Sequence, residues 1–170
     1  MAVRDIRLFG DPVLREVCRP VTDFGPGLER LVTDLIDTGR LPGRAGLAAA
    51  QIGVDLRVFS YNVEGDEGYL INPRLVSSEG HQEGPEGCLS IPGLYAPTPR
   101  AEHAVVTGVD LAGQPITVEG TGLLARCLQH ELDHLDGHLF LGRLAPAERR
   151  QALRALRDRL SGPEPGRAGT

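Results

Sequence analysis

The run from Thr121 to about Leu135 restricts the fold most, because its pattern predicts a helix that needs protein on more than one side. Placed on a wheel at ~100° per residue and continued to Leu139, it shows a leucine stripe, a polar face and a face with two histidines. The leucine stripe consists of Leu124, Leu128, Leu132, Leu135 and Leu139. The polar face consists of Arg126, Gln129, Asp133 and Asp136, and the third face consists of Leu123, Cys127, His130 and His134. We expect a helix enclosed by the fold, with both imidazoles directed into a cleft.

The rest of the chain predicts an α+β fold. Apolar spacing indicates helices at 28–36 and 146–160, and short runs bounded by Gly, Asp or Pro indicate strands. The expected strands are 56–61, 70–72, 103–109 and 116–118. A length of 170 residues fits one domain. We therefore expect a single domain over residues 1–161, with short mixed or antiparallel sheets packed around the central helix, and a disordered tail over 162–170.

Composition excludes several classes of function. The formal net charge is −5 and the 18 basic residues, all Arg, are scattered, so no nucleic-acid-binding face is indicated. No apolar run approaches the ~20 residues that a membrane helix needs. Residues 1–10 lack the features of a secretory signal, so we expect a cytoplasmic protein. The chain has three widely spaced cysteines, and in a reducing compartment these argue against a disulfide framework and favour a metal-binding or catalytic thiol.

The segment His130-Glu131-Leu132-Asp133-His134 is an H-E-x-x-H motif. Its two histidines lie four residues apart on one helical face, so both can reach one ion, and Glu131 can reach a water bound to that ion. This arrangement suits metal-assisted hydrolysis. A five-residue pattern also arises by chance, so two surface histidines beside a solvated glutamate remain an alternative at this point.

A catalytic site of this kind needs a third protein ligand. His138 follows His130 by eight residues, which is ~12 Å of helix rise and too far for one ion. Cys88 is the better candidate, because it lies in a Gly- and Pro-flanked segment where the backbone can bend toward a site. Its alternative is a small buried core cysteine.

Three segments together resemble the signature motifs of the peptide deformylase family. They are Glu86-Gly87-Cys88-Leu89-Ser90, Gln129-His130-Glu131-Leu132-Asp133-His134, and Arg44-Ala45-Gly46-Leu47-Ala48-Ala49-Ala50-Gln51, the last similar to G-φ-G-φ-A-A-x-Q with φ apolar. The resemblance covers nearly everything except the tail. One departure is that Arg44 replaces the motif's first glycine. Arginine does not permit the close backbone approach or positive φ of glycine, so we expect substrate preference to differ more than activity.

The resemblance implies a hydrolase that removes the N-formyl group from the formylmethionine of nascent polypeptides and releases formate. It implies one divalent metal ion held by Cys88, His130 and His134, with iron(II) native and zinc, nickel or cobalt able to substitute. Glu131 would move the proton, while the Gln51 amide and the Leu89 backbone N–H would stabilise the oxyanion.

Supporting residues are also implied. Glu86 and Arg100 would form an ion pair that fixes the cysteine loop, and Asp133 would either support the site or be solvated. Gly46, Leu123 and Cys127, with parts of Ile91 or Tyr95, would line the methionine pocket. The expected partners are formyl-Met nascent peptides, with a transient ribosome contact.

Three alternatives remain open. A zinc endopeptidase would share H-E-x-x-H but needs a third His or Glu downstream. A deformylase-like protein that has lost catalysis could bind metal or peptide, although such a protein would not need Glu131. A structural zinc site would need four protein ligands, and three are evident.

Overall fold

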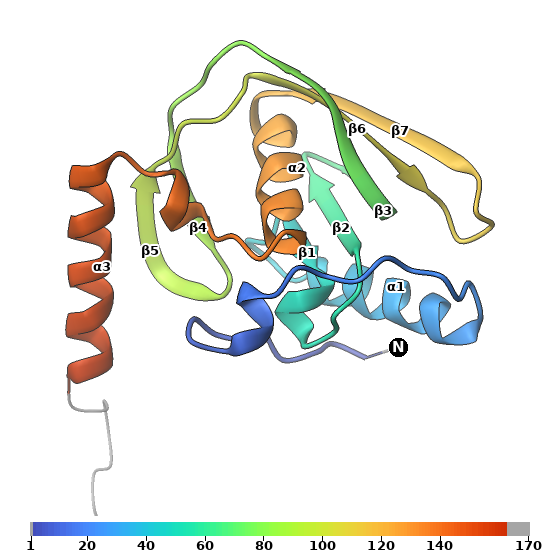
Figure 1. The fold of residues 1–170 in the computed structure, drawn as a ribbon, viewed down its shortest axis with the longest axis horizontal. Helices are drawn as coiled ribbons and strands as arrows, with labels where there is room; N and C mark the ends of the chain where they lie inside the picture. Colours follow the sequence, from blue (N-terminus) through green and yellow to red (C-terminus); the bar gives the residue numbers. More distant parts are fainter. Residues whose placement is uncertain (1, 163–170) are drawn as a thin grey trace, which may run out of the picture.

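The computed structural model describes residues 2–162 and contains the three expected helices (Figure 1). Helix α2 lies at the centre, with two β-sheets, helix α1 and helix α3 around it. The helices are α1 (Pro26–Gly39), α2 (Gly122–Leu135) and α3 (Pro146–Ser161), with 3-10 helices at Pro12–Arg15, Ala49–Ile52 and Phe140–Arg143. The strands are β1 (Gly46–Ala48), β2 (Val58–Val63), β3 (Asp66–Glu79), β4 (Pro85–Cys88), β5 (Ile91–Pro97), β6 (His103–Val109) and β7 (Pro115–Thr121).

The strands form two antiparallel sheets. One has five strands in the order β1-β2-β3-β6-β7, so β1 is an edge strand, and the other is the β4-β5 hairpin. Helix α2 contacts β1, β2, β6 and β7, while α1 packs on β2. The predicted single α+β domain with antiparallel sheets around the H-E-x-x-H helix is confirmed.

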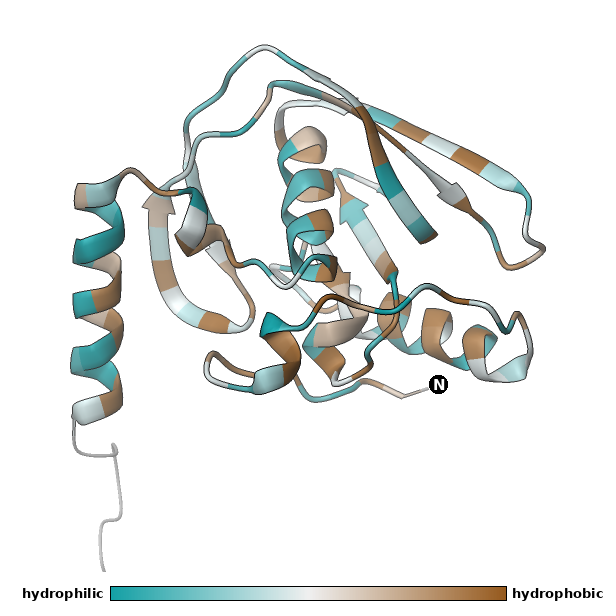
Figure 2. Ribbon diagram, in the orientation of Figure 1, coloured by the Kyte–Doolittle hydropathy of each residue, from teal (hydrophilic) through white to brown (hydrophobic). Residues whose placement is uncertain are grey.

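The leucine stripe of α2 anchors this helix in the main hydrophobic core. The stripe packs against buried side chains of β2, β3 and β6. The contacting residues include Phe59, Leu70, Val106, Leu128, Leu132 and Leu135. Helix α3 is amphipathic and turns its apolar side, with Ala152 and Leu156, toward β5 (Figure 2). In both helices, the face that is apolar in the sequence is the face that packs against a β-sheet.

The helical wheel drawn from the sequence was continued past the C-terminal end of helix α2. Helix α2 ends at Leu135, and Gly137 follows with a φ of +77°. A Cβ on Gly137 would lie 2.6 Å from the Arg15 carbonyl oxygen, so glycine is needed for this turn. Leu139 therefore belongs to the next segment rather than to the stripe. His138 is exposed and lines a separate groove with residues of α3.

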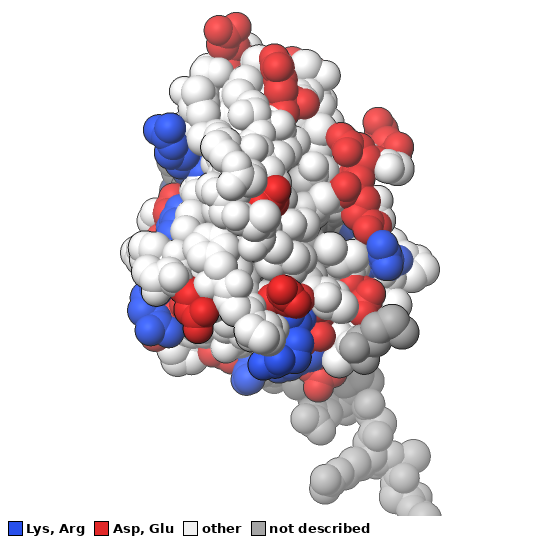
Figure 3. Space-filling view, turned by 90° about the vertical axis from the view of Figure 1, so that its right-hand side faces the viewer, with Lys and Arg blue, Asp and Glu red and all other residues white. Residues whose placement is uncertain are grey.

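The surface agrees with the acidic composition. The face in Figure 3 carries acidic side chains in groups near its top and right side, with arginines among them lower down. Among residues 2–162, none of the helices combines the length and the hydropathy of a membrane-spanning segment.

Truncating the centre of the α2 stripe should destabilise the protein. Leu128 is completely buried, so Leu128→Ala is expected to lower the free energy of unfolding by about 2–5 kcal/mol through lost burial and a residual cavity. Urea denaturation measures this change. Leu160→Ala, at a side chain that is 71% exposed, should change stability by less than about 0.5 kcal/mol. Equal losses in the two variants would contradict this description of the core.

Candidate metal centre

Cys88, His130 and His134 bring three ligand-type atoms together. The His134 Nε2 atom lies 3.3 Å from the Cys88 Sγ atom and 3.1 Å from the His130 Nε2 atom. Ligand atoms at ~2.0–2.3 Å from a tetrahedral ion would lie about 3.3–3.6 Å apart, so this spacing fits one ion with little adjustment. The donors come from the end of β4 and from two successive turns of α2. A thiolate with two imidazoles suits zinc or iron(II).

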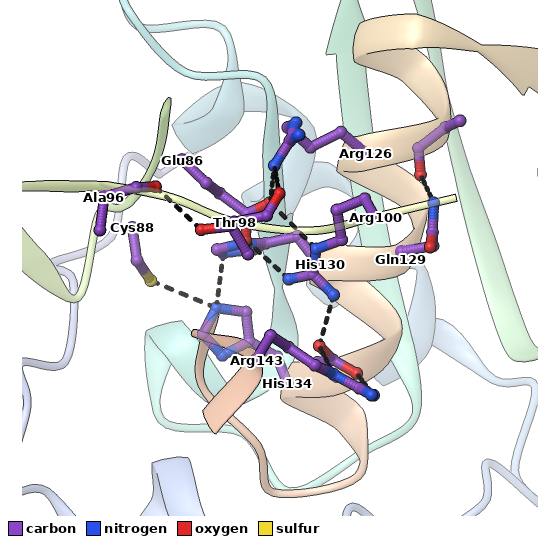
Figure 4. A network of polar contacts seen from close by, with 12 residues as sticks. Glu86, Cys88, Ala96, Thr98, Arg100, Arg126, Gln129, His130, His134 and Arg143 are labelled. Carbon is purple, nitrogen blue, oxygen red and sulfur yellow. Dashed lines mark hydrogen bonds and ion pairs between the residues drawn. The ribbon is translucent and has the colours of Figure 1, made fainter. Parts of the chain in front are cut away.

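The Glu86 carboxylate orients His130 (Figure 4). Its Oε2 atom lies 2.8 Å from the His130 Nδ1 atom and 2.6 Å from the Arg100 Nη2 atom. Its Oε1 atom accepts from Arg100 Nε at 3.0 Å and from Arg126 Nη1 at 2.9 Å. An Nδ1–H that donates to Glu86 leaves the His130 Nε2 lone pair free for a cation. The expected Glu86–Arg100 pair therefore exists and is buried rather than at the surface.

The charge on Glu86 is stabilised by its neighbours. Burial alone would raise the pKa of this carboxyl group, but the hydrogen bonds from His130 and Arg100 outweigh burial and hold the pKa at about 2. Glu86 is therefore ionised at neutral pH and fixes the β4 segment that carries Cys88 against α2.

Asp133 extends this network to the far side of α2. It accepts from Arg100 Nη1 at 2.7 Å and from Arg143 Nη2 at 2.7 Å, and it is buried. Of the two interpretations of Asp133, the supporting role fits the structure and the solvated one does not. Arg126 and Asp133 come from the polar face of the helical wheel, yet both are buried in this network.

Glu131 lies beside the ligand group and is almost completely buried. Burial raises the pKa of Glu131 to about 7, and its Oε2 atom has no hydrogen-bond partner within residues 2–162. The backbone of Gly46 crosses directly over it: a Cβ there would lie 2.6 Å from the Glu131 Oε1 atom and 2.7 Å from the Cys127 Sγ atom. Such a carboxyl group can exchange a proton near neutral pH.

The Gln51 side chain is fully buried beside the ligand group. Its Oε1 atom accepts the Ala48 N–H at 3.0 Å, which orients the amide. Its Nε2 atom then lies 3.7 Å from the Cys88 Sγ atom and 3.3 Å from the Ser90 Oγ atom. The amide group thus presents a donor beside the ligand group.

A cavity of about 580 Å³ opens onto these residues. Most of the residues expected to act on, or bind, the substrate line this cavity, while the expected ligand His134 is buried and does not. The lining includes Gly46, Gln51, Cys88, Leu89, Leu123, Cys127, His130 and Glu131. Of the two residues offered as alternatives for the pocket wall, Tyr95 lines the cavity, whereas Ile91 is buried in a core with Phe140 and Leu141.

Sequence reasoning missed other parts of the cavity wall. Ile6 and Leu8 come from the N-terminal segment, and Pro92 and Gly93 come from β5. No spacing rule links these residues to α2, because their approach depends on long-range pairing such as the Phe9 N–H with the Ser90 carbonyl at 2.8 Å.

Adding one methyl group to Gly46 should impair the site. The Cβ of Gly46→Ala would displace Glu131 or Cys127, and a shift near 1 Å at a reacting group costs about 10²-fold in rate. We expect kcat/KM to fall by about that factor, measured with the formyl-Met peptide substrate that the motif resemblance implies. Gly142→Ala is the matched control, because its Cβ would meet nothing within 4 Å. A fully active Gly46→Ala protein would contradict the close approach.

Comparison with known proteins agrees with the geometry. Residues 3–150 match the family model described as Polypeptide deformylase. The chain is 57% identical over 158 residues to the peptide deformylase of Acidothermus cellulolyticus, covering 93% of this chain and 88% of that protein. It is 51% identical over 160 residues to peptide deformylase 2 of Streptomyces coelicolor, covering 91% and 89%.

Solved structures show the same fold. The peptide deformylase of Thermus thermophilus superimposes with a TM-score of 0.87 at 45% identity, covering 93% of this chain and 95% of that one. The enzyme from Synechococcus elongatus, solved with actinonin, gives a TM-score of 0.83 at 36% identity, covering 89% and 85%. This chain belongs to the peptide deformylase family.

Proposed function

We propose that Cys88, His130 and His134 hold one divalent metal ion, iron(II) natively, in a hydrolase that removes the N-formyl group from the formylmethionine of nascent polypeptides. The observation that carries this assignment is the convergence of their three donor atoms within 4.8 Å of one another beside the buried Glu131. When bound, the ion supplies Lewis acidity, which lowers the pKa of water and polarises the formyl carbonyl group.

Different groups around the ion transfer the proton and stabilise the negative charge. Glu131 takes a proton from the attacking water and delivers it to the departing amine nitrogen, for which a pKa near 7 is well matched. The Gln51 Nε2 amide and the Leu89 backbone N–H donate to the negative charge that develops on the formyl oxygen when water adds to the formyl carbon. The buried Glu86 keeps His130 in the orientation that the ion requires. Formate and a free amino terminus are released.

The substrate enters as an extended chain. The methionine side chain occupies the space between Gly46, Leu123 and Cys127, which all line the cavity. Strand β1 is an edge of its sheet, and the segment Pro85–Cys88 forms the facing wall. A peptide can add to such an edge through its backbone, which accepts many side-chain sequences. This breadth suits an enzyme that acts on most nascent chains.

Domain extent, location and partners follow from this role. We assign residues 1–161 to the catalytic domain, supported by α3, whose buried Ala152 and Leu156 pack toward β5. Of the expected tail, residues 163–170 lie outside the described part. Cytoplasmic location and a transient ribosome contact fit a nascent-chain substrate. The groove beside α3, lined by Arg15, His138, Arg143 and Arg149, is the face we assign to that contact.

The alternatives have less support. An endopeptidase would need a downstream ligand, and His138 is exposed in the α3 groove. A structural zinc site would need a fourth ligand, and the candidate group within residues 2–162 contains three. A catalytically inactive binder would not need Glu131 held next to the ligand atoms.

Formate release from a formyl-Met tripeptide tests the proposal. Protein loaded anaerobically with iron(II) is expected to release formate, to lose activity on chelation and to regain it when metal returns. Nickel or zinc loading should give activity that survives air better, because iron(II) and its thiolate ligand oxidise. Folded, metal-loaded protein that releases no formate would contradict the proposed function.

A further inference from the structure

Arg44 occupies the rim of the substrate cavity at the position where the family motif has glycine. It is half-buried, lines the same cavity as Gly46 and Glu131, and donates from its Nη1 atom to the Thr38 carbonyl oxygen at 2.9 Å. That carbonyl belongs to the last turn of α1, where a cation also interacts favourably with the helix dipole. One donor of the guanidinium is therefore used to position it, and the others have no hydrogen-bond partner among residues 2–162.

The charges of the cavity wall leave Arg44 without a counterion. Glu86 is already shared by Arg100 and Arg126, at 2.6 and 2.9 Å. Glu131 is almost completely buried, and Gly46 lies directly against it. Within residues 2–162, no carboxylate lies within 4.0 Å of the Arg44 guanidinium. By contrast, the neighbouring Arg40 pairs with Glu67 at 2.7 Å and does not line the cavity.

The position of Arg44 next to strand β1 determines which residues of a bound substrate peptide its side chain can contact. Arg44 precedes Gly46 by two residues, which corresponds to at most ~7 Å of extended chain. Gly46 marks the methionine pocket through its approach to Glu131 and Cys127. A substrate strand beside β1 therefore places its second or third residue, counting formylmethionine as the first, within reach of the Arg44 side chain.

We propose that Arg44 is a specificity-determining residue that favours formyl peptides with Asp or Glu at the second or third position. A guanidinium group binds a carboxylate through two parallel, charge-assisted hydrogen bonds. The contact with Thr38 restricts the side chain before substrate arrives, which lowers the entropic cost of that pairing. This inference rests on the deformylase activity and the peptide path proposed above.

Matched peptides test it. The value of kcat/KM is measured for formyl-Met-Glu-Ala-amide against formyl-Met-Gln-Ala-amide, and for formyl-Met-Ala-Glu-amide against formyl-Met-Ala-Gln-amide. The amide cap removes the terminal carboxylate as a competing anion. At low salt, the parent is expected to favour Glu over Gln by about three- to tenfold at one of the two positions. Salt near 0.5 M should shrink the preference, because it screens exposed charges.

Variants separate recognition from support of α1. Arg44→Gln should bring the Glu/Gln ratio to about 1, and Arg44→Glu should reverse it. Arg40→Gln removes the same charge from the same corner and should retain the parent's ratio. A ratio near 1 at both positions in the parent overturns the inference. So does an Arg44→Gln protein that keeps the parent's ratio, since Arg44 would then only anchor α1.

The deformylase activity is read separately from the ratio. Formate release from the two Gln peptides reports the proposed function itself. If the parent releases none, the Glu/Gln ratio is measured as peptide affinity by calorimetry on the metal-loaded protein, with the same two outcomes for Arg44.

Discussion

Replacing Glu131 by Gln is expected to lower kcat for formate release by about 10²–10⁴-fold, the usual contribution of a positioned general acid or base. The side chain is buried beside the three ligand-type atoms, with its Oε2 atom unpartnered in the described residues. A glutamine fills the same space without accepting a proton. Steady-state kinetics on metal-loaded protein measure the loss, and metal analysis should show unchanged occupancy.

Stability gives a second readout for the same variant. Burying a carboxylate costs more free energy than burying an amide of the same size, so Glu131→Gln should unfold at the same or a higher urea concentration than the parent. Activity lost without stability lost is the pattern of a catalytic group. Glu119→Gln, at a side chain that is 63% exposed, is the matched control and should leave kcat unchanged. Near-parental kcat in Glu131→Gln would contradict the assigned role.

The sequence predicted the central helix and its chemistry because both depend on local spacing. His130 and His134 share a face in any α-helix, and the leucines of the same helix repeat with the helix period. Strand β6 has the predicted bounds, His103–Val109. In the structure its residues alternate between buried and half-buried. Cys88 was the better candidate for the third ligand from its Gly- and Pro-flanked segment, the resemblance implied the same residue, and its Sγ atom lies 3.3 Å from His134 Nε2.

Other elements escaped prediction for physical reasons. Strands β1, β4 and β5 are short or rich in Gly and Pro, and their pairing is defined only by distant partners. Strand β3 is much longer than the predicted 70–72. The prediction fell short because the second half of the strand is exposed and has no apolar alternation in its sequence. Arg126 and Asp133 occupy the polar side of the wheel, and only the fold shows that Glu86, Arg100 and Arg143 cover that side.

Replacing Glu86 by Gln is expected to lower the free energy of unfolding by about 3–5 kcal/mol, the cost of removing one partner from a buried ionic network. Arg100, Arg126 and His130 would lose their shared anion. The pKa of Glu86 is depressed from 4.5 to about 2, so its stabilisation is present above a pH of about 4.5 and is lost as the pH falls toward 2. Urea denaturation should therefore show the parent and Glu86→Gln converging in acid.

The same change should also weaken metal binding by about 10–100-fold, because His130 loses the acceptor that sets its ring orientation. Competition with a chelator measures this affinity. Glu83→Gln is the matched control: it lies three residues earlier, its side chain is 64% exposed, and its contact with His81 is 3.7 Å. We expect it to change stability by less than about 0.5 kcal/mol. If Glu86→Gln matched this control in stability and metal affinity, the network would be incidental, and the orientation of His130 would have to come from α2 packing alone.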